Sequence, residues 1–367
     1  MDTLKKVDRI LLFCLLCLAC IGMATLYAAV HSGDLSIWYK QGMYWLVGSI
    51  VFLVMCFIPL RWVGLMAWPV YLLTLLALAL VPLFGDVHMG ARRWLDLGIV
   101  NLQPSELMKW ALLLVLAHWF ATREASSMKD LSVGLLCTII PAGLIVIQPD
   151  LGTALVLLLA AMAVIMVAGF PWKWFVGLLA ASPFAGYILW QNMHDYQKGR
   201  VLSFLNPESD PLGKGYHVIQ SSIAIGSGGI FGKGYLQGSQ SRLHFLPEQH
   251  TDFIFAVLAE EGGLIATVIL FLLYATLISR ILIIALHAHT RFAGLLSVGI
   301  ASVFFLYVFV NIGMVSGMLP VVGVPLPFIS YGGSALLSML MALGLVMRVA
   351  IESHGQVSWQ RPGSPLV

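Results

Sequence analysis

The sequence predicts an all-α polytopic membrane protein with ten transmembrane helices. Of its 367 residues, 60% are hydrophobic and 10% are charged, and the mean hydropathy is +0.92. Soluble domains are about half apolar and about a quarter charged, so this composition excludes an ordinary soluble domain. A membrane-spanning helix needs about 20 mostly apolar residues. We place ten such stretches at residues 10–30, 42–60, 63–84, 105–121, 131–148, 151–169, 174–192, 253–278, 293–317 and 330–350.

The first stretch follows Lys5, Lys6 and Arg9, as the apolar part of a signal peptide would, but it is too long for one. We therefore expect an uncleaved transmembrane helix. Between the fifth and sixth stretches only Gln148, Pro149 and Asp150 intervene, which predicts a tight helical hairpin with Asp150 as the N-cap of the sixth helix. The five cysteines lie in apolar runs without zinc-site or disulfide spacing, and we interpret them as small apolar side chains: Cys14, Cys17, Cys20, Cys56 and Cys137.

The distribution of Lys and Arg in the short loops predicts the orientation, because cytoplasmic loops carry the excess of positive charge. On the side of the N-terminus lie Lys5, Lys6, Arg9, Arg61, Arg123, Lys129, Lys173, Arg280, Arg291, Arg348 and Arg361. Short loops on the other side contain Lys40, Arg92 and Arg93. Both termini are therefore expected in the cytoplasm. A net charge of +3 does not suggest a nucleic-acid partner.

Two polar regions are then expected at the outer side of the membrane, residues 84–109 and a large loop at 193–252 between helices seven and eight. A third break, the segment 318–334, contains three prolines. Irregular backbone at membrane depth persists only where it is buried in protein or lines a polar cavity. We expect one or the other at 318–334.

Two cations near the outer face are candidates for binding a phosphate group. Arg93 could donate bidentately, and Lys109 would act as a point charge. Glu106 lies three residues before Lys109, on the same face of the fourth helix, so a structural Glu–Lys pair is an equally good interpretation. The two interpretations are compatible, because the pair can hold the lysine until a ligand arrives.

The glycine-rich stretch 226–234 does not match a Walker A motif, and we expect a flexible external loop there, with Lys233 either solvated or facing an anionic ligand. After it, residues 243–263 carry four carboxylates and two histidines at a membrane boundary, where ionisable groups are costly and usually functional. These are His244, Glu248, His250, Asp252, Glu260 and Glu261. At least one of Glu260 and Glu261 is expected to pair with a cation on a neighbouring helix.

Asp252 precedes an apolar helix, and two interpretations remain open for it. As an N-cap it would be stabilised by the helix dipole, whereas burial beside lipid would favour a proton-accepting general base. Asn caps a helix as well as Asp does. The substitution Asp252→Asn therefore separates the two interpretations.

The motifs GARRWLDLG, QPSELMK, QPDLGT, NPESDPLGKGYHVIQSSIAIGSGG, FLPEQHTDFIFAVLAEE and NIGMVSGMLPVVGVPLPFISYGGSA, in this order, resemble those of the SEDS family (shape, elongation, division and sporulation). The resemblance extends over nearly the whole chain. It is strongest to the elongation type from Gram-negative bacteria. One departure is Asn101, where family members often have a basic residue.

The resemblance implies a ten-helix peptidoglycan glycosyltransferase of the cell inner membrane. Such an enzyme polymerises lipid II on the periplasmic side, for elongation and rod shape, beside a class B penicillin-binding protein. Family roles carried to this sequence make Asp252 the catalytic carboxylate and Arg93, Glu106 and Lys109 functionally sensitive positions. We add Lys233, Glu248 and His250 as substrate-binding candidates.

In this chemistry Asp252 accepts the proton of the acceptor sugar hydroxyl, which attacks the anomeric carbon of the donor. Undecaprenyl pyrophosphate leaves and the configuration inverts, so one base suffices, unlike in retaining glycoside hydrolysis. We expect no dedicated metal cage; a divalent cation such as Mg²⁺ would be shared with the pyrophosphate. Two other functions remain open, a lipid II transporter and a non-catalytic scaffold. The clustering of polar residues on the outer side favours the transferase, because a transporter exposes its site to both faces.

Overall fold

The computed structural model describes residues 6–88, 91–96, 101–171, 214–242 and 249–353, together with isolated positions between 173 and 198. Nine of the ten predicted stretches coincide with helices; the stretch 174–192 lies mostly outside the described residues. The helices are α2 Arg9–Val30, α3 Ser36–Phe57, α4 Leu60–Leu65, α5 Ala67–Phe84, α6 Pro104–Ala121, α7 Met128–Ile147, α8 Leu151–Val167, α11 Lys214–Gly228, α12 Ser239–Arg242, α13 Ile254–Leu286, α14 Arg291–Val315 and α15 Gly333–Ser353.

Seven of these helices are long and apolar enough to cross a membrane, which makes the chain a multi-pass membrane protein. They are α2, α3, α5, α7, α13, α14 and α15, and α8 is a shorter apolar helix. The five cysteines are all free, as expected. Asp150 begins α8 as predicted, since its side chain accepts a hydrogen bond from the Thr153 amide at 3.3 Å.

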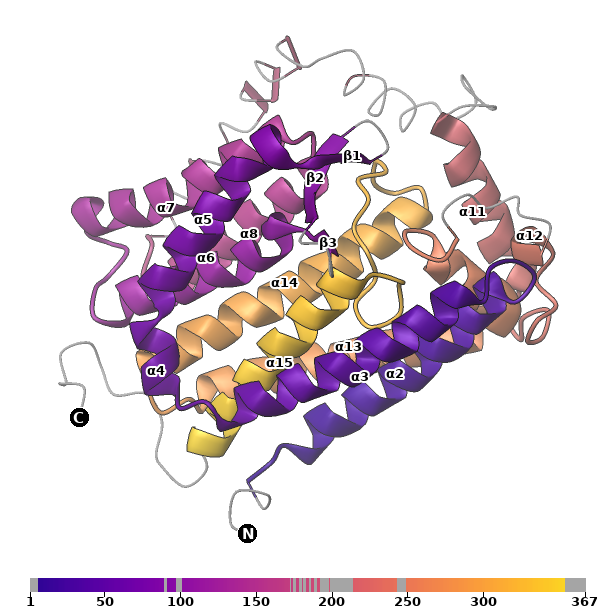
Figure 1. Cartoon of the computed structure of the whole chain (residues 1–367), viewed down its shortest axis with the longest axis horizontal. Helices are drawn as coiled ribbons and strands as arrows, with labels where there is room; N and C mark the ends of the chain where they lie inside the picture. The colour runs from indigo at the N-terminus through magenta and orange to yellow at the C-terminus, as the bar shows by residue number, and fades with distance from the viewer. Residues whose placement is uncertain are drawn as a thin grey trace.

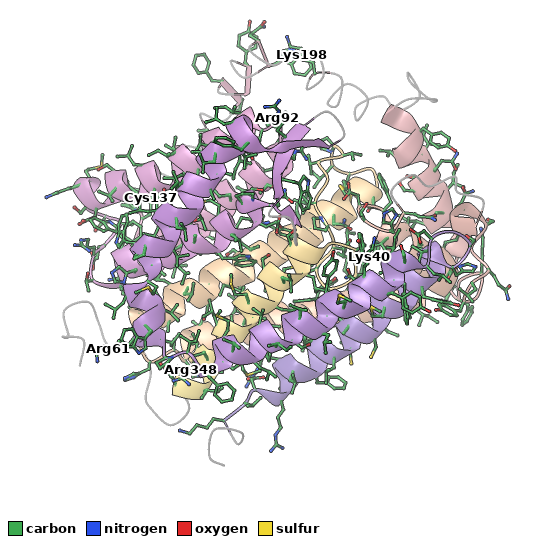
Figure 2. The ribbon with its side chains drawn as sticks, in the orientation of Figure 1. Lys40, Arg61, Arg92, Cys137, Lys198 and Arg348 are labelled. Carbon is green, nitrogen blue, oxygen red and sulfur yellow. The ribbon has the colours of Figure 1, made fainter. Side chains whose placement is uncertain are left out.

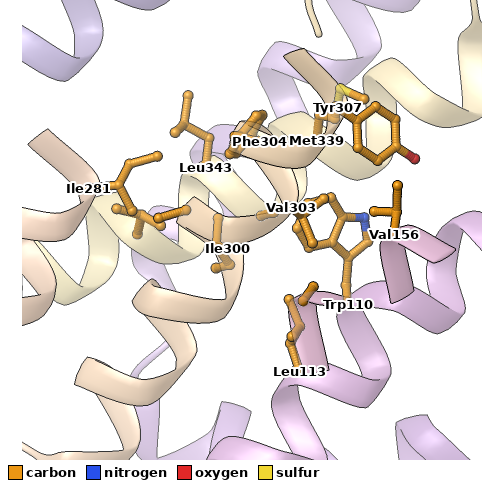
Figure 3. Close-up of a cluster of buried hydrophobic side chains, with 14 of the residues drawn as sticks. Trp110, Leu113, Val156, Ile281, Ile300, Val303, Phe304, Tyr307, Met339 and Leu343 are labelled. Atoms are coloured by element: carbon orange, nitrogen blue, oxygen red, sulfur yellow. The ribbon is translucent and has the colours of Figure 1, made fainter. Parts of the chain in front are cut away.

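The helix α14 lies at the centre of the bundle (Figure 1). In its apolar window 72% of the residues are buried, compared with 22% in α3, so α14 faces protein on nearly all sides. The helices α6, α8, α13 and α15 pack against it. Figure 3 shows the apolar part of this core, to which α14 contributes Ile300, Val303 and Phe304. The hydroxyl of Tyr307, at the edge of the same view, points away from the apolar side chains.

A small antiparallel sheet lies between α5 and α6, in the order β1 Asp86–His88, β2 Ala91–Asp96 and β3 Asn101–Leu102. The prediction of an all-α fold is wrong at this point. Two of the strands, with three and two residues, are too short for an alternating apolar pattern, and the six residues of β2 (ARRWLD) do not alternate. The sheet positions Arg93, on β2, beside the hairpin that joins α7 to α8.

The segment 316–332 between α14 and α15, which we call the linking segment, is non-helical, and its part 324–330 is mostly buried. Its backbone carbonyls receive hydrogen bonds from side chains of the surrounding helices. Gln41 of α3 donates to the carbonyl of Ser330 at 3.2 Å, and Tyr274 of α13 donates to that of Pro327. This confirms the expectation of irregular backbone enclosed by protein.

The two ends of the bundle differ in charge and in contacts. At one end the amide of Asp8 donates to the sulfur of Met347, so the start of α2 lies beside the end of α15. We call this the Asp8 end; Arg280 pairs with Asp8 there at 2.7 Å. Arg348 and Arg61 lie together at this end in Figure 2, whereas Lys40 and Arg92 lie away from it. The linking segment, β1 to β3 and residues 249–253 are at the opposite end, which we call the Asp252 end.

The contact between α3 and α15 generates a stability prediction. A Cβ atom on Gly344 of α15 would lie 2.7 Å from the carbonyl oxygen of Phe52, so Gly344→Ala should force the helices apart. Overpacking of this kind costs about 1–3 kcal/mol, and we expect a lower melting temperature in detergent. The matched control is Gly143→Ala in α7, where nothing lies within 4 Å of the new methyl group, so its melting temperature should stay the same or rise. Equal losses in both variants would contradict this packing.

Candidate active site

Asp252 lies in the turn that precedes α13 and is half-buried. The N-cap of α13 is Phe253, which makes no side-chain capping bond. The interpretation of Asp252 as the N-cap residue is therefore wrong, because the helix begins one residue later than predicted.

Three consecutive carbonyl groups around Asp252 each accept a hydrogen bond from α14 or the linking segment. The amide of Tyr331 donates to His250 at 2.9 Å, the hydroxyl of Ser330 to Thr251 at 2.6 Å and the side-chain amide of Asn311 to Asp252 at 3.0 Å. A turn with all three carbonyls engaged has little freedom to move. The aspartate is thus presented from a fixed piece of backbone.

The Glu106–Lys109 pair is confirmed and is almost completely buried. The Lys109 ammonium lies 2.6 Å from the Glu106 carboxylate, with exposed side-chain fractions of 1% and 5%. Two more hydroxyls approach that carboxylate, from Tyr307 of α14 at 3.1 Å and Ser338 of α15 at 3.4 Å. The ammonium also lies 4.4 Å from the centre of the Tyr307 ring. In this structure both charges of the pair are buried in the core and have partners.

Two residues of α14, Tyr307 and Asn311, connect the Glu106–Lys109 pair to Asp252. They are four residues apart on α14, hence on the same face and about 6 Å apart along its axis. One of them contacts Glu106 and the other contacts the backbone of Asp252. A single central helix therefore sets the spacing between the charged pair and the carboxylate.

Arg93 is engaged with backbone rather than with an acidic side chain. Its guanidinium donates to the carbonyls of Gln148 (3.2 Å) and Pro149 in the hairpin between α7 and α8. At the same hairpin the Gln103 amide lies 3.4 Å from the carboxylate of Asp150. Arg93 is half-buried at the Asp252 end, so its planar donor group lies in the part of the molecule predicted for a phosphate.

The glycine-rich stretch is not a flexible external loop. Residues 226–228 end α11, and the following turn pairs with a break in α13 at Gly263. The amides of Lys233 and Gly234 donate to the carbonyls of Glu260 and Glu261 at 3.0 and 3.1 Å. The pairing of one acid with a cation is confirmed, since Lys233 lies 2.6 Å from the Glu260 carboxylate, although Lys233 is in this turn and not on a helix.

Of the remaining candidates, His250 is half-buried and its ring centre lies 5.9 Å from that of Tyr331. Burial, followed by the neighbouring Tyr44, raises the pKa of the Tyr331 phenol, which keeps it a neutral hydrogen-bonding group. Glu248 and His244 lie outside the described residues. Among the residues that are described, no three His, Cys, Asp or Glu side chains form a group that could hold a metal ion.

Residues 5–355 match the cell cycle protein family of FtsW, RodA and SpoVE. The chain belongs to this family. The peptidoglycan glycosyltransferase MrdB of Escherichia coli (strain K12) is 48% identical over 311 residues, which are 84% of this chain and 83% of MrdB. The resemblance inferred from the motifs is confirmed.

Two solved structures share the fold of this family member. One, described as the structural coordination of polymerization and crosslinking by a peptidoglycan synthase complex, gives a TM-score of 0.84 at 36% identity and covers 95% of this chain and 99% of that chain. The other is the rod shape determining protein RodA of Thermus thermophilus, with a TM-score of 0.73 at 32% identity, covering 95% and 98%. The architecture is therefore RodA-like.

Four residues of this site were not predicted from the sequence, because they are uncharged and the candidates were chosen by charge: Tyr307, Asn311, Ser330 and Ser338. A signal existed for Asn311, because burying an amide within an apolar helix costs free energy unless the amide is hydrogen-bonded.

The buried pair predicts an asymmetric mutational response. Lys109→Met leaves the Glu106 carboxylate buried without its counter-charge and should cost about 3–5 kcal/mol of stability. The double variant Glu106→Gln with Lys109→Met removes both charges, and we expect it to recover most of that loss. Melting in detergent measures both variants. If the double variant melts no higher than the single one, the two charges do not stabilise each other.

Proposed function

We propose that this chain is a peptidoglycan glycosyltransferase that polymerises lipid II into β-1,4-linked glycan strands, with Asp252 as the general base. The observation that carries this proposal is a half-exposed aspartate on a turn whose three carbonyls are all hydrogen-bonded. Catalytic groups must be held in productive geometry, and a fixed backbone supplies that. Family membership supports the reaction class.

The proposed topology has ten transmembrane helices in the cell inner membrane, with both termini in the cytoplasm and the large loop 193–252 in the periplasm. Support comes from the bond between Asp8 and Met347, which brings the start of α2 and the end of α15 to one end of the bundle. Arg61, Arg280 and Arg348 lie at that end, as the positive-inside rule expects for the cytoplasmic side. The Asp252 end then faces the periplasm, where lipid II presents its sugars.

In the proposed reaction the Asp252 carboxylate accepts the proton of the acceptor sugar's 4-hydroxyl as its oxygen attacks the anomeric carbon of the donor. The bond from that carbon to the pyrophosphate breaks on the opposite face, so the α-linked donor becomes a β-1,4 linkage. Undecaprenyl pyrophosphate departs with the electron pair. One carboxylate suffices for a single displacement with inversion.

The three candidate cations differ in how readily each could contact the departing pyrophosphate. Arg93 is half-buried, and its bonds are to neutral carbonyls, which a phosphate can replace with a stronger charge-assisted contact. Lys109 is enclosed beside Glu106 and must leave that pair before it contacts a ligand. Lys233 is already neutralised by Glu260 and, with Glu248 and His250, is proposed to contact the sugar or peptide part.

A divalent cation such as Mg²⁺ is proposed to act only together with the substrate. A magnesium ion keeps several waters and binds one or two carboxylates plus phosphates, so it needs no cage of protein ligands. Bound to the pyrophosphate, the ion would neutralise its charge.

The proposed partner is a class B penicillin-binding protein, a transpeptidase that crosslinks the new strands. Support comes from the structural relative described as a peptidoglycan synthase complex that coordinates polymerization and crosslinking. Apolar side chains exposed on α13 and α14, such as Leu272 and Phe305, face lipid or another helix.

Asp252→Asn tests the proposed base. We expect purified protein with labelled lipid II to bind its substrate as before but to form glycan strands at least 100-fold more slowly, because the amide cannot accept the proton. The matched control is Asp34→Asn, the same change at an exposed acid of the Asp252 end whose role is to accept the Ser36 amide. Normal strand formation by Asp252→Asn would remove Asp252 as the base. Lipid II movement across vesicles without strand formation in the unmutated chain would favour the transporter.

A further inference from the structure

Asn311 is an amide near the C-terminal end of α14, with no exposed surface. Its side-chain nitrogen donates two hydrogen bonds, to the carbonyl of Asp252 at 3.0 Å and to the carbonyl of Val324 at 2.8 Å. Two carbonyl oxygens this close fix the orientation of the amide, because only its NH₂ group can face both of them. Asn311 therefore joins two segments that are far apart in the sequence.

The amide is kept at this position for its donors. Its own oxygen is buried and has no hydrogen-bond partner within the described part of the chain. An unsatisfied buried acceptor costs free energy, and an apolar side chain of similar size would avoid that cost. Such a replacement would instead leave two backbone carbonyls without donors. The cost of the unpaired oxygen is therefore offset by the two bonds to backbone carbonyls, and one of these carbonyls belongs to Asp252.

The second segment bears directly on the carboxylate. Gly323, next to Val324, has a left-handed conformation (φ 69°), and a Cβ atom built on it would lie 3.4 Å from Oδ2 of Asp252. The Asp252 side chain therefore lies over the backbone of the linking segment at Gly323. By holding the carbonyls of residues 252 and 324 on one amide, Asn311 fixes the distance between the acid and the surface it lies on.

We infer that Asn311 is a positioning residue that orients the Asp252 carboxylate for proton transfer. The inference rests on the proposed role of Asp252 as the base. Asn311 touches the backbone of Asp252 and acts through it. It is itself held in place, because Tyr307 one turn earlier on α14 is bonded to Glu106.

A misplacement of about 1 Å at a reacting group costs about 100-fold in rate. Asn311→Leu removes both donors while keeping an apolar helix apolar. We expect the turnover of the full-length protein, purified with its partner transpeptidase, to fall about 100-fold with labelled lipid II. Lipid II binding should stay within about threefold, because the binding groups are untouched. Such a separation of turnover from binding is not expected from a general loss of structure.

Gln41 provides the matched control. It is also a buried amide with two bonds to the linking segment, donating to the carbonyl of Ser330 and accepting from the amide of Gly332 at 3.3 Å. Its bonds reach Ser330 and Gly332 rather than the carbonyl of Asp252, so Gln41→Leu should lower the melting temperature about as much as Asn311→Leu yet keep turnover within about threefold. If both variants lose turnover in proportion to stability, or if Asn311→Leu keeps its turnover, the inference is overturned.

Two further variants keep the result interpretable. If Asn311→Leu does not accumulate in membranes, Asn311→Asp has nearly the same size and offers at most one of the two donors, whether its carboxyl is ionised or protonated. Turnover near the unmutated level would refute the positioning role, and a similar 100-fold fall would support it. Asp252→Asn separates this inference from the proposed function. An active Asp252→Asn overturns the proposed base itself, and the positioning role falls with it. An inactive Asp252→Asn with an active Asn311→Leu removes only the positioning role.

Discussion

The structure depends on hydrogen-bond partners for non-helical backbone that is buried away from water. Between α14 and α15 the chain is irregular, and where it is buried, over most of residues 324–330, its carbonyls need donors from protein. Gln41, Tyr274 and Asn311 supply donors from three different helices. Meeting this requirement brings α3, α13 and α14 together at one end of the bundle. The same segment, through Ser330 and Tyr331, also holds the turn that carries Asp252. The side chains that donate to the buried backbone of the linking segment therefore also hold the candidate active site in place.

The central position of α14 follows from the polar groups that it carries as well as from its apolar ones. Tyr307 reaches Glu106 on α6, and Asn311 reaches the turn before α13. In an apolar core these bonds have few alternatives, so they specify how the helix is rotated as well as where it lies. Apolar packing alone, as among Ile300, Val303 and Phe304, would tolerate small rotations. We conclude that the polar face of α14 sets the register between the charged pair and the aspartate.

Hydropathy predicted the helices well because spanning segments must be long and apolar, and α2, α8 and α14 begin within two residues of the expected positions. The start of α3 was placed six residues late, since Lys40 and Gln41 resemble a boundary, yet Gln41 is buried in its helix. The candidate residues Asp252, Glu106 and Lys109 were identified from charge. Their partners were not, because a hydrogen bond between residues 311 and 252 depends on how helices meet, and local sequence carries no record of it.

Charge at membrane depth was expected to mark function, and the structure separates the acids by how they are satisfied. Glu260 is fully buried and accepts bonds from Lys233, Ser239 and the amide of Gln240. Its role is to attach the segment after α11 to the break in α13, where Gly263 (φ 64°) lets the backbones approach. Glu106 is similarly enclosed among three donors. Asp252 differs because it is half exposed and its backbone is held by neighbouring elements. Exposure on a fixed turn, rather than the number of acids nearby, is the observation behind the proposal of Asp252 as the base.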